Sequence, residues 1–189
     1  MLISIVFCSA LSMLSFADEC REIRGSVLRL HILANSDTVE DQQLKLAVRD
    51  RLLTESCGVF SGASDLESAL YSAEENMESM RNSALDEIRA HGYDYDVDVR
   101  LEDTYFTTRT YGKYTLPAGK YKALRVVIGE GKGHNWWCVM FPPICISPSA
   151  GGAAAEDVLD GEQLGIVEGD GYDVRFKCVE YLERIFGNG

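Results

Sequence analysis

The chain has 189 residues, of which 46% are hydrophobic, enough for one domain with a substantial core. Its 18 basic and 30 acidic residues give a formal net charge of −12. Nucleic acids and anionic membrane surfaces attract proteins that carry a positive field, so this balance argues against both as partners. The acidic excess is typical of a solvated surface.

The first seventeen residues carry no charge, are mostly apolar and end in Ser15-Phe16-Ala17. This run is too short and too often interrupted by serine for a membrane-spanning helix, whereas small residues at 15 and 17 suit cleavage before Asp18. We therefore predict a signal peptide over 1–17, without a basic n-region, and a secreted domain over 18–189. The alternative is a buried N-terminal core helix, which the absence of a polar face disfavours.

Next comes a predicted strand over 26–34, in which apolar residues alternate with a period of two. The turn at 35–37 offers capping oxygens, and apolar residues then recur at helical spacing until Gly58, which predicts a first helix. A second helix is predicted from about Ser64 to Gly92, with methionine and leucine on its core-facing side.

Alternation over 93–102 predicts a half-buried antiparallel strand whose solvated face is rich in aspartate. Two further β-type runs, 105–111 and 121–128, flank a turn at Leu116-Pro-Ala-Gly119. These two runs are predicted to form a hairpin.

A small-residue loop over 147–155 precedes an amphipathic C-terminal helix that is predicted from Val174 to Ile185. The order of the elements predicts the α+β class in a single domain. A mostly antiparallel sheet is expected to pack against two helices from the N-terminal half and the C-terminal helix.

Five cysteines follow residue 17, so one must be free or paired between chains, and several pairings are open. Cys138 and Cys145 are the best disulfide candidates, because the prolines between them could turn the chain and bring their Cα atoms within ~7 Å. The alternative is that both are small buried hydrophobic residues. For Cys178, in the C-terminal helix, burial is the better interpretation.

The segment 129–145 holds both tryptophans and two of the four prolines. Its glycines at 129, 131 and 133 allow positive φ, the tryptophans offer large apolar area, and Pro142-Pro143 excludes a helix or central strand. We expect a rigid apolar feature beside the end of the first strand, with one tryptophan in the core and the other exposed.

A second distinctive segment runs from Leu28 to Asp37 and continues into the first helix. On that helix Asp41, Lys45 and Arg49 recur at four-residue spacing. Two interpretations are about equal: a capped helix with a routine ladder of ion pairs, each worth tenths of a kcal/mol, or a binding edge.

Little in the sequence indicates catalysis or a metal. His134 lies four residues before Cys138, so a thiol nucleophile with a nearby base is conceivable, but exported neighbouring cysteines are more often oxidised. His31, His91 and His134 lack ligand spacing, and the glycine loop lacks the lysine motif of a phosphate loop. We predict no catalytic residue, no metal and no cofactor.

The two distinctive segments together resemble the stage II sporulation protein R family. The resemblance rests on Leu-Arg-Leu-His-Ile-Leu-Ala-Asn-Ser-Asp with Lys-Leu-Ala-Val-Arg-Asp, and on Gly-Lys-Gly-His-Asn-Trp-Trp-Cys-Val-Met-Phe-Pro-Pro-Ile-Cys. It extends over most of the chain after residue 17, including Lys-Cys-Val-Glu-Tyr near the C-terminus.

This resemblance implies a signalling protein of endospore-forming bacteria, not an enzyme. Such a protein is secreted from the forespore into the space between forespore and mother cell. There it activates a membrane-embedded aspartic protease through its extracytoplasmic part, and the protease matures the precursor of an early mother-cell sigma factor. We expect no nucleic-acid partner and no stable membrane insertion after signal cleavage.

The candidate partner-binding residues come from the polar turn, the charged helix face and the tryptophan–proline segment: Asn35, Ser36, Asp37, Asp41, Lys45, Arg49, His134, Asn135, Trp136, Trp137, Phe141, Pro142 and Pro143. The alternative function is a secreted Cys/His thiol hydrolase. A reactive Cys138 with a low pKa favours that enzyme, whereas a Cys138–Cys145 disulfide leaves only the binding interpretation.

Overall fold

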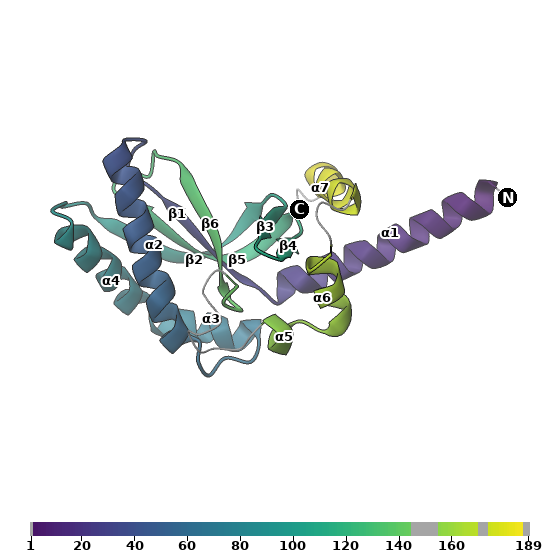
Figure 1. The fold of residues 1–189 in the computed structure, drawn as a ribbon, viewed down its shortest axis with the longest axis horizontal. Helices are drawn as coiled ribbons and strands as arrows, with labels where there is room; N and C mark the ends of the chain where they lie inside the picture. Colours follow the sequence, from purple (N-terminus) through teal and green to yellow (C-terminus); the bar gives the residue numbers. More distant parts are fainter. Residues whose placement is uncertain (1, 145–154, 170–173, 187–189) are drawn as a thin grey trace. The chain divides into compact units, whose positions relative to one another are not determined.

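The computed structural model describes residues 2–144, 155–169 and 174–186 (Figure 1). The chain divides into two compact units. The sheet unit comprises residues 27–104 and 122–158, and the terminal unit comprises the remaining three segments, 1–26, 105–121 and 159–189.

A four-stranded sheet organises the sheet unit, with the strand order β2-β5-β1-β6. Its strands are β1 Leu28–Leu33, β2 Val97–Phe106, β5 Gly119–Ile128 and β6 Asn135–Phe141. β1 runs parallel to β5 and antiparallel to β6. The predicted α+β class is confirmed, and the sheet is mixed, because the helices after β1 provide the long crossover that a parallel neighbour requires.

Three helices follow β1: α2 Val39–Val59, α3 Leu66–Glu75 and α4 Met77–Ala90. The first confirms the predicted helix, but its N-cap is Thr38 rather than a residue of the 35–37 turn, and it ends at Val59, one residue past Gly58. The prediction of a single helix from Ser64 to Gly92 is wrong, because the helix is interrupted at Asn76. There the side-chain amide donates to the Ser72 carbonyl at 2.8 Å, a local bond that competes with the helical pattern.

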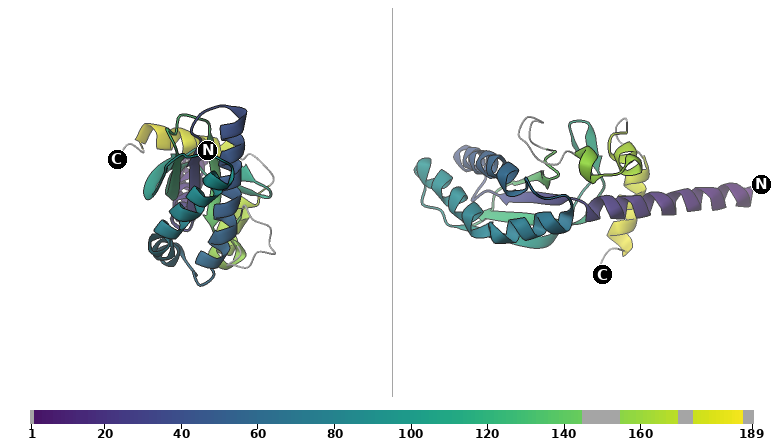
Figure 2. Two further views of the ribbon diagram at one scale, coloured as in Figure 1. Left: turned by 90° about the vertical axis from the view of Figure 1, so that its left-hand side faces the viewer. Right: turned by 90° about the horizontal axis from the view of Figure 1, so that it is seen from below.

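The main core lies between the sheet and these helices. Figures 1 and 2 show the helices on one face of the sheet. Alternate residues of each strand supply it, as a period of two requires, including Leu28, Leu30 and Ile32 of β1. From β2, Val97 and Val99 are buried while Asp98 and Arg100 are exposed. The strand predicted over 93–102 begins later and spans 97–106, and its half-buried alternation is as expected.

The hairpin predicted between 105–111 and 121–128 is wrong. Residues 109–111 form β3 Arg109–Tyr111, which pairs with β4 Tyr114–Leu116 in a separate two-stranded sheet. The two strands join at Gly112 and Lys113, with Gly112 at φ +58°, as a tight two-residue turn requires.

The terminal unit contains α1 Leu2–Gly25, α6 Gly161–Val167 and α7 Val174–Phe186, and α7 confirms the predicted C-terminal helix. A short helix, α5 Ala155–Val158, belongs to the sheet unit. Phe16 and Cys20 of α1 are buried against Phe176 and Val179 of α7. Among the described helices, none combines the length and apolar character needed to cross a bilayer. The signal peptide over 1–17 stays a prediction.

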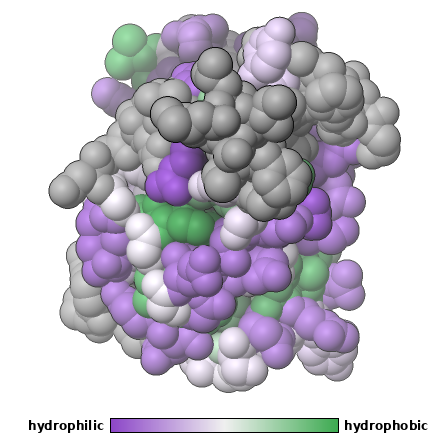
Figure 3. Space-filling view, turned by 90° about the vertical axis from the view of Figure 1, so that its right-hand side faces the viewer, coloured by the Kyte–Doolittle hydropathy of each residue, from purple (hydrophilic) through white to green (hydrophobic). Residues whose placement is uncertain are grey.

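Among the residues coloured in Figure 3, hydrophilic side chains predominate, and hydrophobic side chains show as smaller patches between them. This distribution agrees with the solvated acidic surface that a net charge of −12 indicates.

Candidate functional site

The turn after β1 and the loop before β6 are bound together, and we call residues 34–38 and 129–135 the paired loops. Asn35 is the main link, because its carbonyl accepts from Lys132 N at 3.1 Å and its side-chain oxygen accepts from Glu130 N at 3.0 Å. Gly133 N donates to the Ala34 carbonyl at 2.9 Å. Two segments about a hundred residues apart thus form one hydrogen-bonded unit.

The three glycines of the second loop serve two purposes. Gly129 and Gly131 have φ of +56° and +61°, in the left-handed region that glycine was expected to provide here. Gly133 is needed for close approach instead, since a Cβ there would lie 2.2 Å from the Ser36 carbonyl oxygen.

Asp41 anchors the first loop from within α2. The residue is 4% exposed, and its carboxylate accepts from Ser36 Oγ at 2.6 Å and Asn35 Nδ2 at 2.9 Å. Burial alone would raise the pKa of Asp41, but hydrogen bonds from Ser36, Asn35 and Tyr95 hold that pKa below its ordinary value. The ionised carboxylate therefore keeps the asparagine and serine in place.

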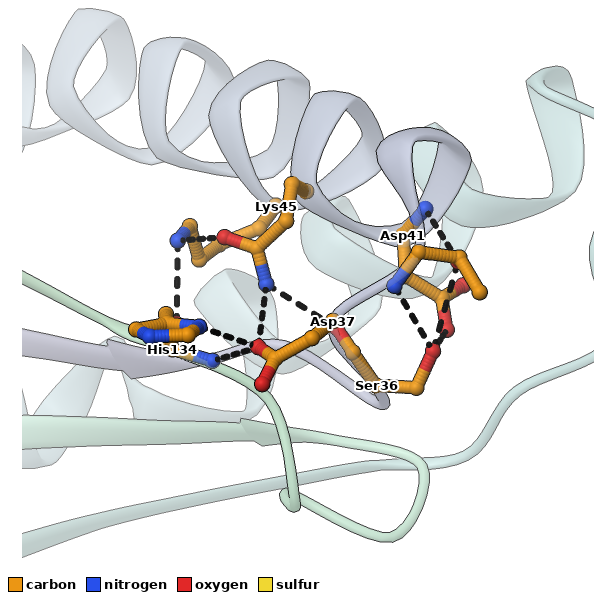
Figure 4. A network of polar contacts seen from close by, with 7 residues as sticks. Ser36, Asp37, Asp41, Lys45 and His134 are labelled. Atoms are coloured by element: carbon orange, nitrogen blue, oxygen red, sulfur yellow. Dashed lines mark hydrogen bonds and ion pairs between the residues drawn. The ribbon is translucent and has the colours of Figure 1, made fainter.

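Lys45 and Asp37 both bond to His134 and so join the two loops (Figure 4). Lys45 is 4% exposed, and its Nζ donates to the His134 carbonyl at 3.0 Å and to Gln42 Oε1 at 2.5 Å. Burial lowers the pKa of Lys45, whereas the negative charge of Asp37 opposes that shift. The buried ammonium is thus held by neutral acceptors rather than by Asp41.

The Asp37 carboxylate contacts His134 twice through Oδ1, which accepts from the backbone N at 2.6 Å and lies 2.5 Å from Nδ1. The side-chain bond from His134, followed by the backbone bond, lowers the pKa of Asp37. Because an ionised carboxylate only accepts, Nδ1 carries the proton in this contact. The His134 side chain is 80% exposed, so the pair sits at the surface.

The ladder of ion pairs considered from the four-residue spacing is not what the structure contains. Asp41 bonds to the turn, Lys45 bonds to Gln42 and His134, and Arg49 pairs with Asp50. The spacing instead places these side chains along the part of α2 nearest the paired loops.

The two tryptophans of β6 point to opposite faces of the sheet, as neighbours on a strand must. Trp136 is partly buried against the main core, and the Arg49 guanidinium lies 4.4 Å from its ring centroid. Trp137 stacks on His31, with centroids 3.8 Å apart. Both are half-buried, so the expectation of one core and one exposed tryptophan is wrong.

His31 ties the stack to the start of β6, since its Nε2 lies 2.9 Å from Asn135 Oδ1. Burial lowers the pKa of His31, the contact with Asn135 opposes this shift, and the charge of Arg125 adds to it. A neutral ring is therefore favoured beneath Trp137.

Sequence reasoning missed Thr38, Gln42 and Tyr95 at this site. The spacing Thr38-Val-Glu-Asp41 is close to a helix N-terminal capping signature and could have identified the cap. No local pattern would have found Tyr95, which reaches Asp41 only through the fold.

Three candidate residues lie away from the paired loops, at the far end of β6. Phe141 is fully buried, and its ring centroid is 6.1 Å from that of Phe60, so it is a core residue rather than a binding residue. Pro142 follows through a cis peptide bond and is buried, and Pro143 is half-buried.

Cys138 is 2% exposed and disulfide-bonded. Its predicted partner, Cys145, lies outside the described residues, so that pairing stays a prediction. Cys178 is exposed with a free thiol, so its predicted burial is wrong. Within the described ranges, no group of histidine, cysteine and carboxylate side chains is arranged to hold a metal ion.

Comparison with known proteins relates the region that holds this site to one family. The family model described as stage II sporulation protein R matches residues 24–150, which include the paired loops and both tryptophans. A relative from Bacillus subtilis (strain 168), named Stage II sporulation protein R, is 34% identical over 140 residues. That match covers 74% of this chain and 62% of the relative. No solved structure matches the chain.

Proposed function

We propose a function on the premise that this chain belongs to the stage II sporulation protein R family, whose model matches residues 24–150. The chain acts as an exported sporulation signal that binds and activates a membrane-embedded aspartic protease. The activated protease then matures the precursor of the early mother-cell sigma factor. The signal is secreted from the forespore into the intermembrane space and meets the extracytoplasmic part of the protease there.

The observation that carries this proposal is the construction of the paired loops within the family-matched region. Their backbone is held by Asn35, Asp41 and Lys45, while Asp37 and His134 remain exposed at the surface. A surface that is already ordered loses little conformational entropy on binding, which favours affinity. Such preorganisation suits a protein whose activity is recognition.

The state of Cys138 favours this ligand over the thiol hydrolase. A disulfide sulfur is not a thiolate, and the thiolate is the nucleophile that such an enzyme needs. His134 has a different partner, because its Nδ1 faces the Asp37 carboxylate.

The test is reconstitution of sigma-factor processing from co-expressed protease and precursor, with and without the exported chain. We expect processing only when the chain is present, and we expect His134→Gln to retain it, because glutamine can still donate to Asp37 without acting as a base. Lack of processing with the wild-type chain would refute the proposed function. Loss of processing by folded His134→Gln, together with thiol labelling at Cys138, would favour the hydrolase.

A further inference from the structure

Arg49 is held on an aromatic surface with its polar edge covered by one carboxylate. Its guanidinium carbon lies 4.4 Å from the Trp136 ring centroid, and its side chain is 19% exposed. Asp50 Oδ1 accepts from Arg49 Nε at 2.8 Å and lies 2.6 Å from Nη2. Because Asp50 is 66% exposed, this carboxylate covers the guanidinium from the solvent side.

A second cation lies one helical turn earlier. The Lys45 ammonium is buried and bonded to the neutral oxygens of Gln42 and His134. Burial lowers the pKa of Lys45, the charge of Asp37 opposes this shift, and the positive charge of Arg49 adds a smaller lowering. Asp41 is occupied by the turn residues. Lys45 and Arg49 therefore place two cations one helical turn apart on α2, each with one nearby carboxylate, Asp37 and Asp50, on a chain whose net charge is −12.

We propose that Arg49, oriented by Trp136, binds a carboxylate side chain of the partner protein, and that Asp50 occupies that position in the unbound chain. This inference rests on the proposed function, since the partner is the extracytoplasmic part of the protease. Arginine and tryptophan are the residues most enriched among those that dominate interfaces, and a guanidinium fork matches a carboxylate with two bonds.

The observations favour a different protein over a second copy of this chain as the source of the carboxylate. Two copies would each bring a net charge of −12, and their repulsion opposes association. A partner whose acidic residue is set in a less negative surface meets no such penalty.

The test compares four full-length chains for binding to the purified protease in detergent micelles. Arg49→Gln removes the fork, and Asp50→Asn removes the internal carboxylate. Arg51→Gln is the matched control, because Arg51 makes the same kind of pair with Glu55 on the same helix at 2.6 Å. We expect Arg49→Gln to weaken binding about tenfold, Asp50→Asn to strengthen it about threefold, and Arg51→Gln to change it less than twofold.

The opposite changes in affinity separate recognition from a structural role. If the Arg49–Asp50 pair only stabilised the fold, Arg49→Gln and Asp50→Asn would change the affinity for the protease in the same direction. Equal binding by the Arg49 and Arg51 variants, or weaker binding by Asp50→Asn, would overturn the inference while leaving the proposed function intact. A wild-type dimer that Arg49→Gln dissociates, measured by light scattering, would assign the carboxylate to a second copy and also overturn it. Failure of the wild-type chain to bind would refute both proposals.

Discussion

Replacing Gly133 with alanine tests the close approach that holds the paired loops together. Its φ lies outside the left-handed region, so an added Cβ is not strained by the backbone itself. That Cβ would lie 2.2 Å from the Ser36 carbonyl oxygen, whereas such contacts are essentially never under 3.0 Å. The loop must therefore move by about 1 Å, which breaks bonds of ordinary length.

Two hydrogen bonds fail directly: Gly133 N to the Ala34 carbonyl at 2.9 Å and His134 N to Asp37 at 2.6 Å. The neutral bond is worth about 1 kcal/mol, and the bond to the exposed Asp37 carboxylate is screened by solvent. We therefore expect Gly133→Ala to lower the free energy of unfolding by about 1 kcal/mol or more.

The assay is urea unfolding followed by circular dichroism, with sigma-factor processing measured on the same preparations. Gly58→Ala is the matched control, because a Cβ at Gly58 in α2 meets nothing within 4 Å and should stabilise the helix slightly. If the free energy of unfolding of Gly133→Ala lay within about 0.5 kcal/mol of the wild-type value, the usual range for surface substitutions, the close approach at Gly133 would not constrain the loops.

Three further predictions concern the same site. Because folding lowers the pKa of Asp41, its ionised carboxylate stabilises the fold fully above the unfolded pKa of about 4, and this stabilisation is lost as pH falls through the lower folded pKa. Asp41→Asn should therefore flatten the acid side of a plot of unfolding free energy against pH. An unchanged slope would contradict this. Lys45→Met keeps the side-chain length but removes the hydrogen bond to the His134 carbonyl, so the free energy of unfolding, measured with heat or urea, should fall by about 1–2 kcal/mol. An unchanged free energy of unfolding would mean that water replaces the ammonium. Trp136→Ala should cost about 3 kcal/mol in urea unfolding because Trp136 packs on the main core, and Trp137→Ala should cost less; the reverse order would refute the assignment of faces.

Much of the fold could be predicted because the relevant signals are local. The period of two in β1 and β2 reflects side chains alternating across a sheet, and the spacing of α2 and α7 reflects helical geometry. Positive φ at Gly129 and Gly131 was also predictable from the sequence, since glycine adopts it at no steric cost. For the site, the sequence identified the polar turn, His134 and the tryptophans as candidates without showing how they meet.

Tertiary structure alone decided which of these residues act together. Asp37 and His134 are 97 positions apart, and their contact depends on β1 lying between β5 and β6. The same pairing buries Phe141 in the core, although its segment looked like a binding feature. Likewise, Lys45 has Asp41 four residues away but bonds to the carbonyl of a distant loop. Sequence spacing encodes the faces of single elements, whereas strand order and burial set which faces meet and which charges lose their water.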